Sequence, residues 1–405
     1  MESKLKPSYK QTEVGPIPGD WEVKSLGSLV SYRNGKAHEK NITDYGRYVV
    51  VNSKFISTEG AIRKYSDDCF CPTSKGDVLM VMSDVPNGRA IAKCYFVESD
   101  DTYTANQRIC VLSPRDVDGQ LLFYKLNRNP FYLAFDDGAK QTNLRKVDVL
   151  SCPLAIPESL VEQCAIAKAL SDVDQLIGAL DKLIAKKRDL KQATVQQLLS
   201  GKIRPKEYSE EWETKRLGQL CRSIVDGTHF TPEYVDDGIP FYSVENVTAN
   251  DFTNTKFISA SEHEQLIKRC KPERGDILLT RIGSIGDTKL IDWDVNASIY
   301  VSLALVKVSE CVDARYLYCY TKSQQFIKDI EDRSLLNASP KKINMGDIAS
   351  VPIFLPPTRN EQAAIADILM DMDIEIAALE QRRDKTRALK QGMMQELLTG
   401  KTRLI

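Results

Sequence analysis

The chain has 405 residues and a formal net charge of −1, so it is long enough for two or three domains and is not a uniformly basic nucleic-acid coat. Apolar residues make up 42% of the sequence and charged residues 27%, as in ordinary globular proteins. The sequence has no apolar run of membrane-spanning length and no apolar signal-peptide core, so we expect a cytoplasmic protein. Its ten cysteines are scattered and it has only three histidines, which favours free thiols over a metal site.

Residues 1–156 are predicted to form a first globular domain behind a short polar lead-in. A W-x-x-x-x-L-G motif, Trp21 to Gly27, opens this domain. Two apolar, β-branched runs at 47–56 and 77–83 predict strands, and a helical segment is expected at 120–135. A polar loop and a proline-bounded strand complete the domain, so the segment predicts a mixed α/β fold.

Residues 157–201 are predicted to form one long helix of roughly 60 Å. Ser159 and Glu162 have the spacing of a capping box at its start, and Gly201 is a typical helix end. Apolar residues recur along it at coiled-coil spacing, namely Val173, Ile177, Leu180 and Ile184, with Leu176, Leu183 and Leu190 alongside. Such a stripe requires a partner helix.

The second half of the chain repeats the first. The W-x-x-x-x-L-G motif returns at Trp212 to Gly218 and opens a second predicted globular domain, residues 202–355. A second predicted long helix lies in residues 356–405, where Thr358 and Glu361 repeat the capping box and Gly400 the end. The sequence therefore predicts two similar α/β domains, each followed by a long helix.

Charge predicts how the two helices pair. In each of them the first half is acidic and the second half is basic. A parallel pair would place like charges together, whereas an antiparallel pair places each acidic half against the basic half of its partner. We therefore expect an antiparallel coiled coil with a pseudo-twofold internal repeat.

No catalytic motif stands out in the sequence. It has no Walker loop and no dinucleotide-binding glycine pattern, and three histidines with no associated motif define no triad. The short Glu-x-Lys sequences at 22–24 and 213–215 follow the repeated tryptophans and are better explained as strand surfaces. A binding protein is favoured over an enzyme.

Polar loops in both halves combine arginine with asparagine and glutamine, side-chain types that can bind the edges of DNA bases. Arginine binds guanine and asparagine or glutamine binds adenine through paired hydrogen bonds. Any one of these loops is more often a solvated turn, but their presence in both halves favours a binding role. The candidate DNA-binding residues are Asn87, Arg89, Asn106, Gln107, Arg108, Lys140, Gln141, Asn143 and Arg145 in the first half, and Thr228, His229, Ser243, Glu245, Asn246, Arg281, Lys341, Lys342 and Asn344 in the second.

The duplicated motifs resemble those of the DNA-specificity subunits of type I restriction–modification systems. The resemblance rests on the repeated W-x-x-x-x-L-G, on the loop containing Gln141 and Asn143, and on the E-Q-x-A-I-A helix that ends in L-L-x-G-K. It covers essentially the whole chain. The second loop departs from the pattern, since Lys341 and Lys342 precede Ile343 and Asn344 there.

The resemblance implies a division of labour along the chain. Residues 1–156 and 202–355 would be target recognition domains that read the two halves of a gapped site in double-stranded DNA. The helices in 157–201 and 356–405 would be spacers that dock two methyltransferase subunits. The chain itself would be non-catalytic and hold no cofactor, since S-adenosylmethionine and the adenine-modifying site belong to the methyltransferase, and nuclease activity to a further restriction subunit.

A second hypothesis also fits the sequence. A duplicated coiled-coil adaptor that joins two proteins without binding DNA would also fit the near-neutral net charge. Steep salt dependence of DNA binding would separate the two hypotheses, because phosphate contacts release counterions. The half-site sequences and the gap length depend on loop geometry and do not follow from the sequence.

Overall fold

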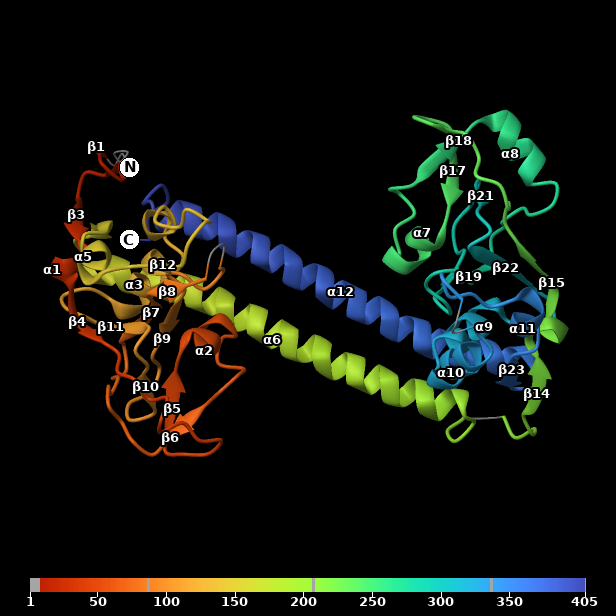
Figure 1. Ribbon diagram of the computed structural model, residues 1–405, viewed down its shortest axis with the longest axis horizontal. Coiled ribbons are helices and arrows are strands. Elements are labelled where there is room, and N and C mark those ends of the chain that lie inside the picture. Colours follow the sequence, from red (N-terminus) through yellow and green to blue (C-terminus); the bar gives the residue numbers. More distant parts are fainter. Residues whose placement is uncertain (1–7, 86–87, 206–207, 336–337, 405) are drawn as a thin grey trace, which may run out of the picture. The chain divides into compact units, whose positions relative to one another are not determined.

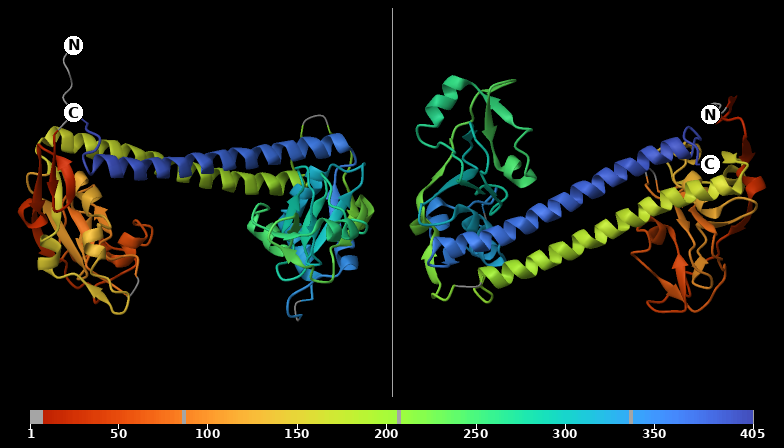
Figure 2. Two further views of the ribbon diagram at one scale, coloured as in Figure 1. Left: turned by 90° about the horizontal axis from the view of Figure 1, so that it is seen from above. Right: turned by 180° about the vertical axis from the view of Figure 1, so that it is seen from behind.

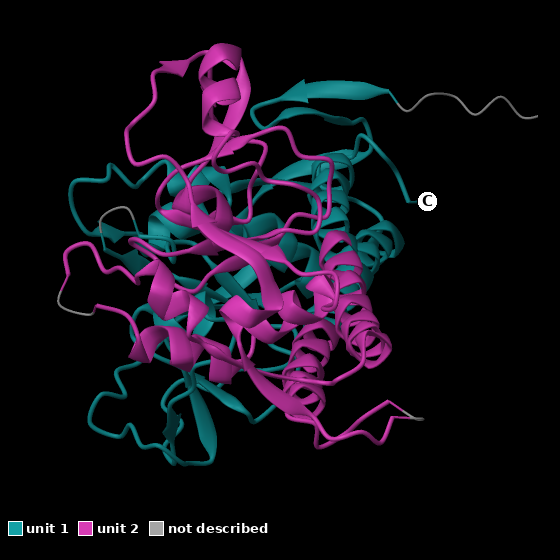
Figure 3. Cartoon of the chain, turned by 90° about the vertical axis from the view of Figure 1, so that its right-hand side faces the viewer, with its two compact units in different colours: residues 1–181, 382–405 teal, residues 182–381 magenta. Residues whose placement is uncertain are grey.

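The computed structural model describes residues 8–85, 88–205, 208–335 and 338–404. The chain forms two compact units, which Figure 3 colours separately: unit 1 is residues 1–181 with 382–405, and unit 2 is residues 182–381. Each unit contains one globular domain and one half of each long helix.

Unit 1 is built around the antiparallel four-stranded sheet β4-β11-β7-β9 (Figure 1). A smaller sheet, β10-β5-β6, covers one of its faces and helix α3 the other. Its elements outside the long helices are β1 (Tyr9–Thr12), β2 (Gly15–Pro18), β3 (Trp21–Ser25), α1 (Leu26–Leu29), β4 (Val30–Asn34), β5 (Tyr48–Val51), α2 (Ser53–Ser57), β6 (Tyr65–Ser66), β7 (Val78–Val81), β8 (Ser83–Asp84), β9 (Cys94–Phe96), β10 (Tyr103–Ala105), β11 (Ile109–Pro114), α3 (Gly119–Leu126), α4 (Pro130–Leu133), β12 (Thr142–Asn143), α5 (Lys146–Leu150) and β13 (Pro153–Pro157).

Unit 2 repeats this plan. Its antiparallel sheet β15-β22-β19-β20 has the strand order of unit 1, and a second sheet, β16-β18-β17-β21, covers one face. Its elements outside the long helices are β14 (Glu213–Arg216), η1 (Leu217–Leu220), β15 (Cys221–Asp226), β16 (Tyr234–Val235), β17 (Ile239–Tyr242), α7 (Val244–Ala249), β18 (Lys256–Ile258), α8 (Ala260–Leu266), β19 (Ile277–Thr280), β20 (Thr288–Leu290), β21 (Ser298–Ile299), β22 (Leu303–Val308), α9 (Ala314–Thr321), α10 (Gln324–Asp332), α11 (Met345–Ala349) and β23 (Pro352–Leu355).

The central strands are apolar on both faces because both faces are covered. In β7, Val78 and Met80 pack toward α3, whereas Leu79 and Val81 pack toward the smaller sheet. Strand β19, Ile277–Thr280, is buried throughout in the same way. Each strand follows a glycine in the left-handed region, Gly76 at φ +93° and Gly275 at φ +92°, where a residue with a side chain would be strained.

The two long helices are α6 (Leu160–Leu199) and α12 (Arg359–Leu397). They run side by side in opposite directions within each unit, as the two views of Figure 2 show. Both end as predicted, at Gly201 with φ +70° and Gly400 with φ +72°. The prediction of two similar α/β domains with an antiparallel helix pair is therefore confirmed.

Ion pairs between the helices follow the predicted charge pattern. In unit 2, the amine of Lys187 on α6 lies 2.7 Å from Glu375 on α12, and Lys191 pairs with Asp373. In unit 1, Lys390 on α12 lies 2.6 Å from Asp174 on α6. A basic half thus faces an acidic half in both units. In unit 2 the basic residues belong to α6, and in unit 1 they belong to α12.

Three of the leucines predicted to lie alongside the seam are exposed. Leu180 and Ile184 are buried between the helices, whereas Leu176, Leu183 and Leu190 keep 40%, 39% and 51% of their surface. These three are spaced by seven residues, so they share one outward face of α6. None of the described helices combines the length and the apolar character needed to cross a bilayer.

Candidate nucleic-acid interface

In unit 1 the three predicted loops meet at one end of the central sheet. Strand β8, which follows β7, pairs with β12, so the loop after Ser83 lies beside the loop that contains Asn143. The backbone N–H of Met82 donates to the carbonyl of Arg108 at 2.9 Å, which brings in the third loop. Segments that are about 60 residues apart in sequence therefore present their polar side chains together.

Several unit 1 candidates are exposed at this end, namely Arg89, Gln107, Arg108, Lys140, Gln141, Asn143 and Arg145. Asn143 accepts hydrogen bonds from Ser83 at 2.5 Å and from Gln141 at 3.3 Å. Gln107 donates to Glu39 at 2.9 Å. Asn87 lies outside the described residues.

Asn106 and Arg145 are also hydrogen-bonded within the protein. Asn106 accepts hydrogen bonds from the backbone N–H groups of His38 and Gln107, so its amide fixes the loop. Arg145 donates twice to Asp148, at 2.9 and 2.8 Å, and this hydrogen bonding lowers the pKa of the Asp148 carboxyl. The side chain of Arg145 nevertheless stays largely exposed.

In unit 2 the corresponding loops converge on Arg281, which directly follows β19. Its guanidinium donates to Asp226 at the end of β15, to the carbonyl of Val301 before β22, and to the carbonyl of Ile343. The last carbonyl belongs to the loop that contains Lys342. One side chain thus ties three loops together.

This position corrects the interpretation of Arg281 as a base-contacting residue. Arg281 is only 9% exposed, and its Nε and Nη1 groups already donate hydrogen bonds inside the protein. Asn246 is likewise buried. Its amide accepts a hydrogen bond from the backbone N–H of Ser243 and donates to the carbonyls of Asp251 and Asn254. The structure assigns both residues to holding the loops in shape.

The remaining unit 2 candidates divide into supporting and exposed residues. Thr228 is buried and Ser243 caps α7, so both support the local fold. The candidates with exposed side chains are His229, Glu245, Lys341, Lys342 and Asn344. The exposed group is thus smaller than the sequence predicted, and its basic residues are the two lysines and the histidine.

Sequence reasoning missed Arg269, which is 60% exposed and bonds Asp226 at 2.6 Å through one terminal nitrogen. It lies between α8 and β19, and nothing in its local sequence distinguishes it from other exposed arginines. Asp226 lies two residues before Thr228, at the end of β15. Its carboxylate also binds His229 at 2.9 Å, so it gathers three basic side chains.

The two units use one backbone plan with different side chains. Met82 takes the place of Arg281. The backbone N–H of Leu144 donates to the carbonyl of Met82, and the backbone N–H of Ile343 donates in the same way to the carbonyl of Arg281. By strand register, Asn34 takes the place of Asp226. The loops therefore share a frame while their chemistry differs.

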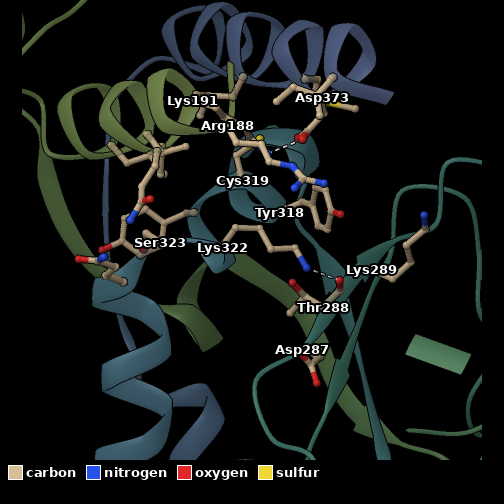
Figure 4. A pocket seen from close by; sticks show the side chains of 18 of the residues that line it. Arg188, Lys191, Asp287, Thr288, Lys289, Tyr318, Cys319, Lys322, Ser323 and Asp373 are labelled. Atoms are coloured by element: carbon tan, nitrogen blue, oxygen red, sulfur yellow. Dashed lines mark hydrogen bonds and ion pairs between the residues drawn. The ribbon is translucent and has the colours of Figure 1, made fainter. Parts of the chain in front are cut away.

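A pocket in unit 2 lies where the two long helices pass α9 (Figure 4). Four cations line it, and each already has a partner. Arg188 pairs with Glu380, Lys191 pairs with Asp373, Lys289 donates to Asn250 at 2.9 Å, and Lys322 donates to the carbonyl of Thr288 at 2.6 Å. These charges hold unit 2 together, so we assign the pocket no ligand.

All ten cysteines are free thiols. Within the described ranges, no three His, Cys, Asp or Glu side chains gather closely enough to hold a metal ion. The loop ends instead present guanidinium, amine and amide groups, which bind phosphates and base edges. Fold and loops together define a DNA-binding protein with two recognition modules.

Comparison with known proteins identifies the family. The model of the type I restriction modification DNA specificity domain matches residues 18–187 and 209–387, once in each half of the chain. The chain therefore belongs to the family of type I restriction–modification DNA specificity subunits.

Individual relatives extend over almost the whole chain. The putative type I restriction enzyme MjaX specificity subunit of Methanocaldococcus jannaschii is 27% identical over 98% of this chain and 97% of its own length. The MjaVIII specificity subunit of the same organism is 24% identical over 98% and 96%. The crystal structure of a type I S subunit from M. genitalium, 17% identical, covers 97% of this chain and 99% of its own with a TM-score of 0.66, which shows a shared fold.

Proposed function

We propose that this chain gives a type I restriction–modification complex its sequence specificity by reading a gapped, two-part DNA target. The loop end of the sheet in unit 1 reads one half of the target, and the equivalent end in unit 2 reads the other. Contacts to bases come from the exposed residues of these loops, and buried residues such as Arg281 and Asn246 hold the loops in position.

One observation carries this proposal. In both units, three loops converge at the same end of a sheet with the same strand order, yet the side chains differ between the units. A scaffold that only joined two proteins would gain nothing from different polar side chains at equivalent loop ends. A reader of two unlike half-sites needs this difference, because each base pair requires its own pattern of donors and acceptors.

We further propose that the chain catalyses nothing by itself. Two methyltransferase subunits dock on the helix pair, bind S-adenosylmethionine and methylate adenine, and restriction subunits join the same complex. The exposed leucine stripe of α6, with Leu176, Leu183 and Leu190, supports docking on the helices, because a partner would remove this apolar surface from water. A cytoplasmic location follows from a target in cellular DNA.

The test compares the purified chain with the chain assembled with a methyltransferase subunit that binds it. Each is incubated with S-adenosylmethionine and genomic DNA, and modified adenines are mapped by sequencing. We expect methylation only by the assembled complex, at one sequence made of two specified parts and an unspecified gap. Methylation by the purified chain alone would contradict the non-catalytic role, and an uninterrupted target would contradict the two-part reading.

A further inference from the structure

Unit 2 contains a charged cluster centred on the carboxylate of Asp226. The side chain of Asp226 is 9% exposed and accepts hydrogen bonds from Arg269 at 2.6 Å, His229 at 2.9 Å and Arg281 at 3.2 Å. The three donors come from three segments: the turn after β15, the connection between α8 and β19, and the end of β19. A single buried anion thus organises all of them.

The cluster has an excess of positive charge on its outer side. Two guanidinium groups share one carboxylate, so the net charge is positive even when His229 is neutral. Arg281 is buried, whereas the side chains of Arg269 and His229 are 60% and 61% exposed. The uncompensated charge therefore lies at the surface, on Arg269.

This surface adjoins the candidate recognition loop. Arg281 binds Asp226 and also the carbonyl of Ile343, so the cluster lies directly behind the segment that carries Lys341 and Lys342. Both of these lysines are exposed. In unit 1, Asn34 stands at the register position of Asp226 and accepts a hydrogen bond from Tyr32, an uncharged arrangement.

We propose that Arg269, positioned by Asp226, binds a DNA phosphate beside the bases that unit 2 reads. The proposal rests on the function proposed above and adds a residue that the loops did not suggest. Asp226 already holds one terminal nitrogen of Arg269, which limits how the guanidinium can turn toward the edge of a guanine. The remaining N–H donors of Arg269 suit a phosphate group, whose oxygens accept charge-assisted hydrogen bonds.

Asp226 acts as a positioning residue in this arrangement. An arginine free in solution loses side-chain entropy when it binds, and a carboxylate that already holds the guanidinium removes part of that cost. The same carboxylate neutralises buried Arg281. Asp226 thus links the shape of the recognition loop to the placement of the phosphate contact.

The test measures DNA binding by the chain assembled with its methyltransferase subunits, over a range of salt concentrations. We compare wild type with Arg269→Gln and with the control Arg222→Gln, which removes the same charge from an exposed arginine near the other end of β15. Loss of one phosphate contact lowers the slope of log K against log salt by about 0.9. We expect this loss for Arg269→Gln only, with the methylated sequence and the unfolding temperature unchanged.

A wild-type slope in Arg269→Gln would overturn the proposal, and so would a changed half-site sequence, which would indicate base contact instead. In Asp226→Asn we expect the same loss of slope, and adding Arg269→Gln to that variant should lower it no further. A further loss in the double variant would show that Arg269 acts without Asp226. If the wild-type complex itself bound DNA without sequence preference, the proposed function would fail instead, so the two failures are distinguishable.

Discussion

The guanidinium of Arg204 binds the carboxylate of Glu361 through two hydrogen bonds of 2.7 and 2.6 Å. Arg403 binds Glu162 in the same way, at 2.5 and 2.8 Å. Each arginine follows the end of one long helix, and each glutamate belongs to the first turn of the other. Both glutamates are buried, and each also accepts a hydrogen bond from one of the repeated tryptophans. Trp212 donates to Glu361, and Trp21 donates to Glu162.

Replacing Arg204 by Gln should destabilise unit 2 strongly. The substitution leaves Glu361, 1% exposed, without its ionic partner, and removing one member of a buried pair costs about 3–5 kcal/mol. Urea unfolding of the full chain measures the change. The control is Lys168→Gln, whose partner Asp172 is exposed, with an expected cost under about 0.5 kcal/mol. Equal effects of the two substitutions would contradict a special role of the Arg204 pair.

Lys125 should make the stability of unit 1 depend on pH. Its amine donates to the carbonyl of Leu398 and is otherwise buried over the ring of Trp21, and this burial lowers its pKa to about 7. Between pH 7 and 10.5 the unfolded chain therefore binds more protons than the folded chain, so stability rises with pH in this window, by at most about 1.4 kcal/mol per pH unit.

Unfolding midpoints at several pH values measure this dependence. In Lys125→Met we expect the rise between pH 7 and 10 to become smaller. If the variant kept the full wild-type rise, other groups would be responsible for it.

The pairing of the helices should respond to charge reversal. Lys187→Glu places a second anion opposite Glu375, and each such exposed contact contributes about 0.2–1 kcal/mol. We expect a lower unfolding midpoint at low salt, recovered in the double variant Lys187→Glu with Glu375→Lys. High salt should reduce the difference, because it screens exposed charges. A double variant less stable than both single variants would argue against direct pairing.

Arg89 and Arg281 should behave differently although the sequence suggested one role for both. Arg89 is exposed, so Arg89→Ala should leave folding intact and weaken recognition of one half-site only, by about 1–3 kcal/mol if the side chain binds a base. Arg281 is buried, so Arg281→Ala should lower the unfolding midpoint and displace the loops of unit 2. DNA binding and thermal unfolding of both variants test these different roles. Equal unfolding midpoints for Arg89→Ala and Arg281→Ala would contradict the structural role of Arg281.

Exchange of residues 202–355 for the same segment of another family member should change one half of the target. The central sheet of unit 2 forms entirely within this segment, so its loops should keep their frame. Sequencing of methylated DNA reads out the new target. The modular interpretation would be wrong if both halves changed together.

The repeat, the long helices and their direction could be predicted because they depend on periodicity and charge, which are local properties of the sequence. The helix starts illustrate the limit. Thr358 does accept from the backbone N–H of Glu361, but the Glu361 side chain turns to Arg204 and Trp212 rather than back to the helix start. Arg204, 157 positions away, binds the carboxylate that would otherwise cap the start of the helix. A rule based on neighbouring residues cannot predict such a distant contact.

One predicted strand was too long for a related reason. The run 47–56 predicted a strand, yet β5 ends at Val51 because the Asn52 side chain accepts from the N–H of Phe55 and starts α2. In unit 2 the corresponding run becomes β17 followed by α7. The β-branched residues favoured a longer strand. The capping side chain of Asn52 and the burial of Phe55 and Ile56 stabilise a helix instead.

The recognition residues were the least predictable part. Exposed Arg and Asn in loops are common, and whether Arg281 faces solvent depends on Asp226, 55 residues earlier. Asn246 looked like a base reader but closes a turn with its own neighbours. Arg269 differs from other exposed arginines only in its bond to Asp226, which forms when the chain folds.

The division of the chain between the units sets an order for folding during synthesis on the ribosome. Unit 2 is one continuous stretch, residues 182–381, and all its partners have been translated once residue 381 emerges. Unit 1 needs residues 382–405, including Arg403, which neutralises Glu162 in a domain translated more than 200 residues earlier. The domain that is made first is thus completed after the second, and until then its half of α6 remains without its partner helix and accessible to chaperones.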